Sequence, residues 1–330
     1  MPALASPSTV HPPIFSGMHP AYDVMIGPDG LVRVYFAGGP VNAALAAGLL
    51  APHVGMYKKI RLATLYGSDN PPDYTEFHAV GVQFDGLMVP GKLRRNTLDL
   101  SKSCQAEPQL GTSELQITPG HIRTYRGFFA SVQPGQVVAF TGSLPDKNLV
   151  SPLEYAQLIC WVLAEKKARV IIDTRPEIML VILDHLKAVL GEQSMEFARV
   201  VIKQNRSEFK KLVGDRVLPE DWVNQARSVL PSASLIVTCG GDGMLVVEPN
   251  DAMRMWLRSE HSPTIIKTDG CGDAQVAGTG VGLALGQSIM EAARLGMGVA
   301  QANTETLGPG RIRPERALEL ADRIQVEPVH

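Results

Sequence analysis

The chain has 330 residues, of which 45% are hydrophobic and 19% are charged, with a formal net charge of -2 and a pI near 6.5. This composition is typical of a globular protein that buries a substantial core in one large α/β domain or two smaller ones, and it excludes disorder. The weak net charge gives no electrostatic basis for binding nucleic acid or an anionic membrane.

The cysteines and histidines exclude several kinds of metal and disulfide site. The four cysteines lie far apart without a C-x-x-C pair, and the eight histidines show no H-x-x-H or H-E-x-x-H spacing. Reduced thiols in a cytoplasm explain such cysteines best. The first residues lack the basic region and apolar core of a signal peptide, and no apolar run is long enough to cross a bilayer. We therefore expect a cytoplasmic protein.

Two segments in the first third of the chain alternate polar and apolar residues, namely Leu31 to Phe36 and Leu93 to Leu100. Alternation is typical of half-exposed antiparallel strands. The period of two places Arg94 and Asn96 on one face of the second segment. These segments predict a small sheet that projects from the main body.

From about Ser131 onward, apolar runs alternate with helical patterns. Strands are predicted at 137–142, 168–174, 198–204 and 234–241, helices at 151–168, 176–191 and from Asn205, and a short hairpin-like segment at 244–249. Strands that are apolar throughout and separated by helices indicate a mainly parallel sheet with helices on both faces. Ligands of such α/β folds bind beyond the carboxyl ends of the strands.

The segment TDGCGDAQVAGTG, Thr268 to Gly280, places a carboxylate behind a Gly-Cys-Gly turn. Small residues at Gly270, Cys271 and Gly272 would let backbone N–H groups approach an anion at a helix N-terminus. The same positive end would keep Asp273 ionised, ready to accept a hydroxyl proton. A tight turn with an acid at the helix start is the structural alternative.

The segment Lys203 to Glu208 allows two interpretations. Asn205 and Glu208 have the spacing of a capping box, in which each side chain bonds the other residue's backbone N–H. The same amide and carboxylate, at the end of a strand, could hold water around Mg²⁺.

Two glycine-rich segments are equally ambiguous. In Ala37 to Gly48, glycines allow a ligand to approach and Asn42 could bond a hydroxyl, or the segment is a turn before an alanine-rich helix. The segment Thr238 to Gly243 could line a nucleotide base, or it is a glycine-rich β-turn. No Walker A pattern occurs in the sequence, which argues against a P-loop nucleotide site.

The order of these motifs resembles that of the ribokinase-like sugar kinases, in the phosphofructokinase-B branch that includes 1-phosphofructokinase and tagatose-6-phosphate kinase. The similar segments are HPAYDV (19–24), AGGPVNAA (37–44), RRN (94–96), FTGSLP (140–145), IKQNRSEF (202–209) and TDGCGDAQVAG (268–278). They run in order from about Ile14 to Gly310, nearly the whole chain, and the last is the most specific. The resemblance implies a three-layer α/β fold over residues 1–330, with a small β-sheet lid formed by 88–118 and about 24–37.

The resemblance also implies ATP, Mg²⁺ and a sugar hydroxyl as phosphoryl acceptor, with a monovalent cation and a homodimer through the lid as further expectations. It makes Asp273 the general base and Gly270, Cys271 and Gly272 the anion hole. The remaining implied roles are substrate binding by Asp23, Gly38, Gly39, Asn42, Arg94 and Asn96, nucleotide binding by Lys203, Thr238, Gly240, Gly243 and Asn303, and water-mediated Mg²⁺ binding by Asn205 and Glu208.

The sequence departs from this family's pattern at the substrate side. Gly39 and Pro40 stand where phosphosugar kinases of the branch carry a lysine and a glycine, and Gln204 replaces a proline. An arginine at 94 or 95 could replace the missing lysine, since guanidinium binds phosphate well. A hexose phosphate is the first expected acceptor, an unphosphorylated sugar or nucleoside the second. A third hypothesis is a sugar-phosphate sensor without activity, which should lack its base or metal residues, whereas Asp273, Asn205 and Glu208 are present.

Overall fold

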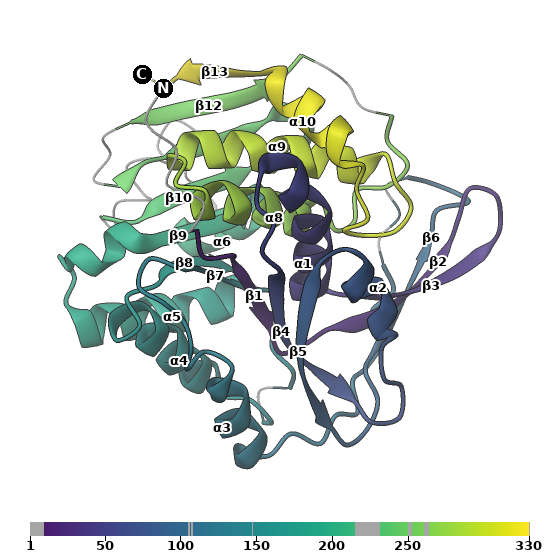
Figure 1. Cartoon of the computed structure of the whole chain (residues 1–330), viewed down its shortest axis with the longest axis horizontal. Helices are drawn as coiled ribbons and strands as arrows, with labels where there is room; N and C mark the ends of the chain where they lie inside the picture. Colours follow the sequence, from purple (N-terminus) through teal and green to yellow (C-terminus); the bar gives the residue numbers. More distant parts are fainter. Residues whose placement is uncertain are drawn as a thin grey trace.

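A ten-stranded, mainly parallel sheet forms the centre of the molecule (Figure 1). The computed structural model describes residues 10–104, 106, 108–146, 148–214, 232–249, 253–260 and 264–329. The strands are β1 (Ile14–Gly17), β4 (Ile60–Gly67), β5 (Val82–Val89), β7 (Val137–Thr141), β8 (Arg169–Asp173), β9 (Val200–Asn205), β10 (Ser234–Thr238), β11 (Met244–Val247), β12 (Arg254–Ser259) and β13 (Ile324–Pro328). Their order is β13-β12-β11-β10-β9-β8-β7-β1-β4-β5.

The neighbouring strands β10, β9, β8, β7, β1, β4 and β5 run parallel to one another. At one edge of the sheet, β11, β12 and β13 are added, each antiparallel to its neighbour. Every residue of β7 is buried, as expected for a parallel strand covered on both faces. The predicted parallel sheet with helices on both faces is thus confirmed, and so is the hairpin that β10 and β11 form.

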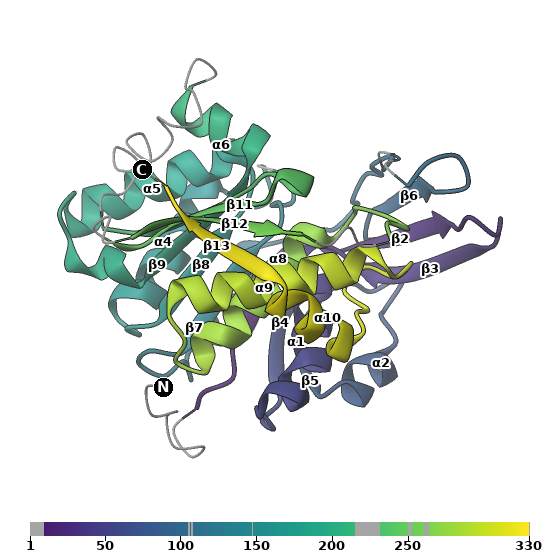
Figure 2. The ribbon, with the colours of Figure 1, turned by 90° about the horizontal axis from the view of Figure 1, so that it is seen from above.

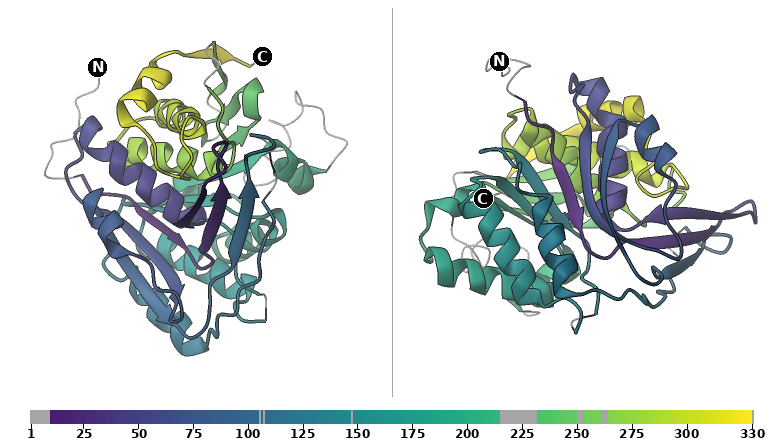
Figure 3. Two further views of the ribbon diagram at one scale, coloured as in Figure 1. Left: turned by 90° about the vertical axis from the view of Figure 1, so that its right-hand side faces the viewer. Right: turned by 60° about the horizontal axis from the view of Figure 1, so that its bottom comes forward.

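Two layers of helices cover the sheet (Figures 2 and 3). One face carries α1 (Gly39–Leu50), α8 (Cys271–Ala284), α9 (Ile289–Thr304) and α10 (Pro314–Asp322), and the other carries α4 (Pro152–Ala164), α5 (Pro176–Leu190) and α6 (Arg206–Val213). The short helices α2 (Tyr74–Ala79) and α3 (Pro119–Gly127) pack near β4 and β5. Helices α1 and α8 are buried on nearly all sides, which explains their alanine- and glycine-rich sequences. No helix in the described part of the chain is both long and apolar enough to cross a membrane.

A separate three-stranded sheet, of order β3-β2-β6, projects from one end of the body (Figure 2). It consists of β2 (Ala21–Ile26), β3 (Val32–Ala37) and β6 (Arg95–Asp99). Strand β3 is antiparallel to β2, as expected for the segment 31–36, although β2 itself was not predicted. Strand β6 pairs with β2 in parallel, so the expectation of an antiparallel strand there is wrong. Strand β2 follows β1 and strand β6 follows β5 in the chain. Because β1 and β5 run in the same direction, β2 and β6 both leave the large sheet at its carboxyl edge and run outward together.

The first part of the large sheet is missing from the sequence-based prediction. Strands β1, β4 and β5 were not predicted, and neither were the edge strands β12 and β13. Strand β5, VQFDGLMV, carries a glutamine, an aspartate and a glycine, so its pattern is neither continuously apolar nor strictly alternating. Of the segment 88–118 that was expected to form the lid, Arg95–Asp99 supplies β6.

Candidate active site

Polar residues end neighbouring strands at the carboxyl edge of the large sheet. Asp173 ends β8, Asn205 ends β9 and Thr238 ends β10. Thr238 lies opposite Asn205 in the register of β9 and β10. Because these strands are parallel, the three side chains lie along one edge, where α/β proteins bind their ligands.

The turn before α8 brings its glycines and its acid to this edge. Gly270 is the N-cap of α8 and has a φ of 74°, in the left-handed region that favours glycine. Asn303 of α9 holds the turn, because its Nδ2 donates to the Asp269 carbonyl at 3.1 Å and its Oδ1 accepts from the Gly310 N–H at 2.9 Å. The first N–H groups of α8 have no partner within the helix, so they offer donors and a positive end to an anion.

Asp273 is a half-buried carboxylate in the first turn of α8. The Nδ2 of Asn42, from α1, donates to its Oδ2 at 2.8 Å. Burial raises the pKa of Asp273 to about 7, aided by the charges of Asp173 and Asp269 and opposed by the Asn42 hydrogen bond and by Lys203. A carboxylate with its pKa near neutral can accept and release a proton at physiological pH.

Lys203 lies beneath the same turn. Its Nζ is 3.0 Å from the Asp173 Oδ2, and a Cβ added to Gly272 would lie 2.7 Å from that Nζ. Burial lowers the pKa of Lys203, but the negative charges of Asp173, Glu208 and Asp273 outweigh burial and raise it. The ammonium group is therefore charged and lies against the turn that was predicted to bind phosphate.

A small polar cavity of about 170 Å³ lies on one side of Asp273. All six residues predicted to bind the substrate line it, together with both acids of the turn: Asp23, Gly38, Gly39, Asn42, Arg94, Asn96, Asp269 and Asp273. The Nδ2 of Asn96 donates to the Asp23 Oδ1 at 2.8 Å. Burial and the charge of Asp269 raise the pKa of Asp23 to about 6, against the effects of Asn96, Arg94 and Lys267. The Oδ1 of Asn42 is buried without a hydrogen-bond partner among the described residues.

A larger cavity of about 440 Å³ lies on the other side of the turn. Its lining includes the predicted nucleotide residues Thr238, Gly240 and Gly243, as well as Cys271 and Gly272. Apolar and small residues of α9 complete it, among them Met297 and Ala300. The turn thus separates a polar cavity from a larger, mostly apolar one.

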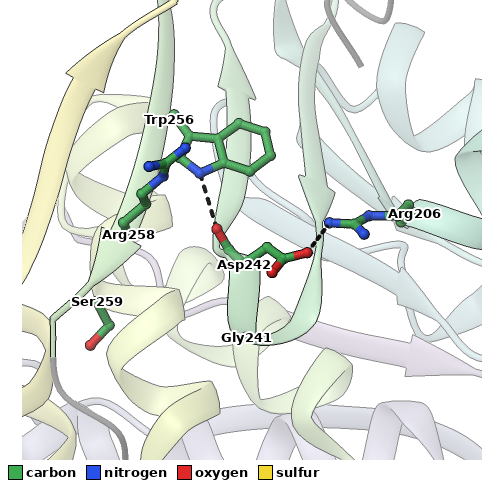
Figure 4. A pocket seen from close by; sticks show the side chains of 6 residues that line it. All are labelled: Arg206, Gly241, Asp242, Trp256, Arg258 and Ser259. Carbon is green, nitrogen blue, oxygen red and sulfur yellow. Dashed lines mark hydrogen bonds and ion pairs between the residues drawn. The ribbon is translucent and has the colours of Figure 1, made fainter. Parts of the chain in front are cut away.

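An open pocket behind the Gly240–Asp242 turn shows how that turn is fixed (Figure 4). Arg206, at the start of α6, forms an ion pair with the Asp242 carboxylate, and the indole N–H of Trp256 donates to the Asp242 carbonyl at 3.1 Å. Gly241 lines this pocket and also the 440 Å³ cavity on the other side. The contacts to Asp242 therefore position the glycines that face the larger cavity.

Asn205 and Glu208 form the capping box that their spacing predicts. The Asn205 Oδ1 accepts from the Glu208 N–H and the Glu208 Oε2 accepts from the Asn205 N–H, each at 2.9 Å. Burial raises the pKa of Glu208. Among the described residues, no group of three His, Cys, Asp or Glu side chains could hold a metal directly. Water-mediated binding of a metal by Asn205 and Glu208 stays a prediction.

Two predicted nucleotide residues occupy supporting positions. Lys203 pairs with Asp173, and Asn303 is fully buried while it holds the turn before α8. Their contact with nucleotide stays a prediction.

The sequence reasoning missed Asp173, Lys267 and Asp269, although Asp173 lies at the end of a predicted strand and Asp269 lies inside the segment Thr268 to Gly280. The Nζ of Lys267 donates to the Asp269 carbonyl at 2.6 Å.

Comparison with known proteins identifies the family. The profile of the pfkB family carbohydrate kinases matches residues 29–316. The 1-phosphofructokinase of Bacillus subtilis (strain 168) is 26% identical over 185 residues, which cover 54% of this chain and 55% of that protein. The match to this curated relative thus spans about half of its length.

Solved structures show a similar fold over nearly the whole chain. A possible 1-phosphofructokinase of Thermotoga maritima has a TM-score of 0.76 at 18% identity, with 97% of this chain and all of that one covered. Phosphofructokinase-2 of Escherichia coli, solved in complex with potassium, has a TM-score of 0.73 at 20% identity, with coverages of 95% and 99%. Together with the profile match, these likenesses show that the chain belongs to the pfkB family of carbohydrate kinases, with a ribokinase-like fold.

Proposed function

We propose that this protein transfers the γ-phosphoryl group of ATP to a hydroxyl group of a hexose phosphate, with Asp273 as general base. The observation that carries the proposal is the position of Asp273 between two cavities. Its side chain lines the polar cavity, while Cys271 and Gly272, in the same helical turn, line the larger one. A phosphoryl donor and a hydroxyl acceptor can therefore meet at one carboxylate.

The chemistry needs little more than this arrangement. The acceptor oxygen forms a bond to the γ-phosphorus, the bond to the ADP oxygen breaks, and the hydroxyl proton passes to the Asp273 carboxylate. The N–H groups at Gly270, Cys271 and Gly272 would stabilise the negative charge on the transferring group. Lys203, charged and adjacent to Gly272, supports the same role.

The larger cavity fits a nucleotide. Its glycine turn, Gly240 to Gly243, offers backbone N–H groups for phosphates, and its apolar wall on α9 suits a base. Asn205 and Glu208 would hold Mg²⁺ through water, at the end of β9 beside Asp173. When bound, the metal would neutralise charge on the phosphate oxygens. A monovalent cation stays an expectation for this chain.

The smaller cavity fits a sugar. Asp23 accepts a hydrogen bond from Asn96, and Asn42 has an unpartnered Oδ1 among the described residues that could accept one from a sugar hydroxyl group. Arg94 supports an acceptor that already carries a phosphate. Gly39 in place of the usual lysine favours the alternative, an unphosphorylated sugar or a nucleoside.

The small sheet would act as a lid that keeps water from competing with the acceptor. Leu31, Val32 and Val34, at and near β3, are 58% to 63% exposed. Such an apolar strand favours a homodimer through the lid. We infer a cytoplasmic enzyme, since its four cysteines are free thiols, as is usual in a reducing compartment.

ATP consumption with Mg²⁺ across a panel of acceptors tests this function. The panel contains fructose 1-phosphate, fructose 6-phosphate, tagatose 6-phosphate, free hexoses, ribose and nucleosides. Turnover on a phosphosugar supports the proposal, and turnover only on an unphosphorylated acceptor keeps the kinase but overturns its substrate. Binding without any turnover would favour the sensor.

A further inference from the structure

Lys267 is a fully buried lysine for which the proposed chemistry gives no role. It lies in the segment that leads into α8, and the exposed fraction of its side chain is 0%. Burial is costly for an ammonium group, because it removes the water that stabilises the charge. Lysine is almost never fully buried unless its charge is paired, so its surroundings should show what it serves.

The ammonium group of Lys267 is bonded to the turn before α8. Its Nζ donates to the Asp269 carbonyl at 2.6 Å, and the Asn303 Nδ2 donates to the same oxygen at 3.1 Å. The backbone is held as well, because the N–H groups of Ile266 and Lys267 donate to the Thr304 carbonyl at 2.7 and 3.3 Å. Asn303 and Thr304 are the last two residues of α9. The end of α9 and this lysine therefore hold the same carbonyl group of the turn.

The surroundings of Lys267 are acidic. Burial lowers its pKa, and the neighbouring thiol and carboxyl groups oppose this shift, namely those of Cys271, Asp269, Asp273 and Asp23. The three acids also line the polar cavity beside the turn. Their combined charge would repel the phosphoryl group that must approach the turn, and a fixed ammonium group offsets part of that charge.

We propose that Lys267 is a positioning residue for phosphoryl transfer, whose ammonium group holds the turn at Gly270 and gives it a fixed positive charge. Lys267 lines neither of the two cavities, so it would act through the turn rather than on a ligand. The turn leads into the first N–H groups of α8, which would stabilise the transferring group, so a shift of the turn would displace these donors.

The same charge bears on the monovalent cation that the family resemblance led us to expect. A cation bound at this turn would be repelled by the buried ammonium group of Lys267 at short range. At this turn, therefore, a residue of the chain replaces the expected cation, and the enzyme should not need added potassium. This inference rests on the proposed function, because it names a further residue for the same reaction.

Lys267→Ala and Lys267→Met separate the charge of the lysine from its volume. Alanine leaves a space that a small cation can enter, whereas methionine fills most of that space without a charge. We expect kcat with ATP and the preferred acceptor to fall about tenfold to a hundredfold in both variants, with the KM values nearly unchanged. Ammonium or potassium chloride should restore part of kcat in Lys267→Ala, relative to tetramethylammonium chloride at equal ionic strength. Neither wild type nor Lys267→Met should respond to these salts.

Binding of ADP with aluminium fluoride, a mimic of the transferring phosphoryl group, gives a measurement that does not depend on turnover. Its calorimetric Kd should rise about tenfold in both Lys267 variants, with the Kd for ADP alone unchanged. Lys166→Met is the matched control, because the Lys166 Nζ donates to the Ala130 carbonyl at 2.7 Å. These two residues precede β8 and β7, at the opposite, amino edge of the sheet, so this variant should match wild type.

The outcomes separate this inference from the proposed kinase function. Equal kcat and equal affinity for ADP with aluminium fluoride in wild type and the Lys267 variants would overturn the inference and leave the kinase intact. Activation of wild type by potassium, or a Lys267→Ala variant that no cation restores, would also overturn it. A parallel loss of melting temperature and of affinity for ADP alone would show a general structural effect and contradict the assignment. A wild type without turnover, whose binding of ADP with aluminium fluoride depends on Lys267, would uphold the role at the turn and overturn the kinase.

Discussion

The two cavities beside the turn at Gly270 are built in opposite ways. The larger one is lined by the glycines Gly240, Gly241 and Gly243, which expose backbone, and by a mostly apolar surface. The smaller one is lined by charged and amide side chains, among them Asp23 and Arg94. Backbone donors suit the phosphates that all nucleotides share, whereas side chains discriminate between sugars. We therefore expect substitutions in the smaller cavity, and not those in the larger one, to change which sugar the protein accepts.

The strongest way to test this difference is Asp23→Ala. The substitution removes a buried carboxylate that accepts a hydrogen bond from Asn96 and that would accept one from a sugar hydroxyl. We expect kcat/KM for the acceptor to fall by about tenfold to a hundredfold, with KM for ATP unchanged. Steady-state kinetics in which the acceptor and ATP are varied in turn measure the two parameters separately. An equal loss on the ATP side would show that the cavities do not act separately.

The pH dependence of kcat/KM for the acceptor sharpens the contrast further. Burial raises the pKa of Asp273 to about 7 and that of Asp23 to about 6. Both carboxylates act when ionised, so activity should be full above pH 7 and decline by about tenfold per pH unit below it, then more steeply below pH 6. The Kd for ATP, measured without an acceptor, should change little over the same pH range. A flat kinetic profile down to pH 5 would contradict the role of Asp273.

The smallest effect is expected behind the glycine turn of the larger cavity. Trp256→Phe keeps an aromatic ring but removes the hydrogen bond to the Asp242 carbonyl. KM for ATP should rise about two- to tenfold while KM for the acceptor stays constant. Trp161→Phe, on α4, is the matched control. If only acceptor kinetics changed, the assignment of the larger cavity to nucleotide would be wrong.

Sequence alone predicts the parts of the fold whose pattern is local. Strands such as β7, apolar throughout, and helices such as α4, with its Ser151 cap, were predicted close to their bounds. Strand β5, with Asp85 and Gly86 in its middle, was not. The parallel pairing of β6 with β2 depends on where both strands leave the body, and no local pattern encodes that.

In the candidate site, too, features that depend on one local segment were predicted and those that depend on distant segments were not. All six residues that the motifs predicted to bind the substrate line the polar cavity, because each motif carries its own glycines or polar side chains, whereas Asp269 in the same lining was missed. Lys203 was assigned to nucleotide, yet its ion pair with Asp173 depends on two strands that the sequence separates by about 30 residues. The contact between His19 and Ser143 is also non-local, since it needs β1 and β7 to be neighbours in the sheet.

The most direct test of the central claim compares wild type and Asp273→Asn with ATP, Mg²⁺ and the preferred acceptor. Asp322→Asn, at a largely exposed acid of α10, serves as the matched control. We predict that kcat falls by about 10² to 10⁴ in Asp273→Asn, while calorimetry still detects both ligands. Turnover within a few-fold of wild type, with both ligands bound, would contradict the claim that Asp273 takes the hydroxyl proton.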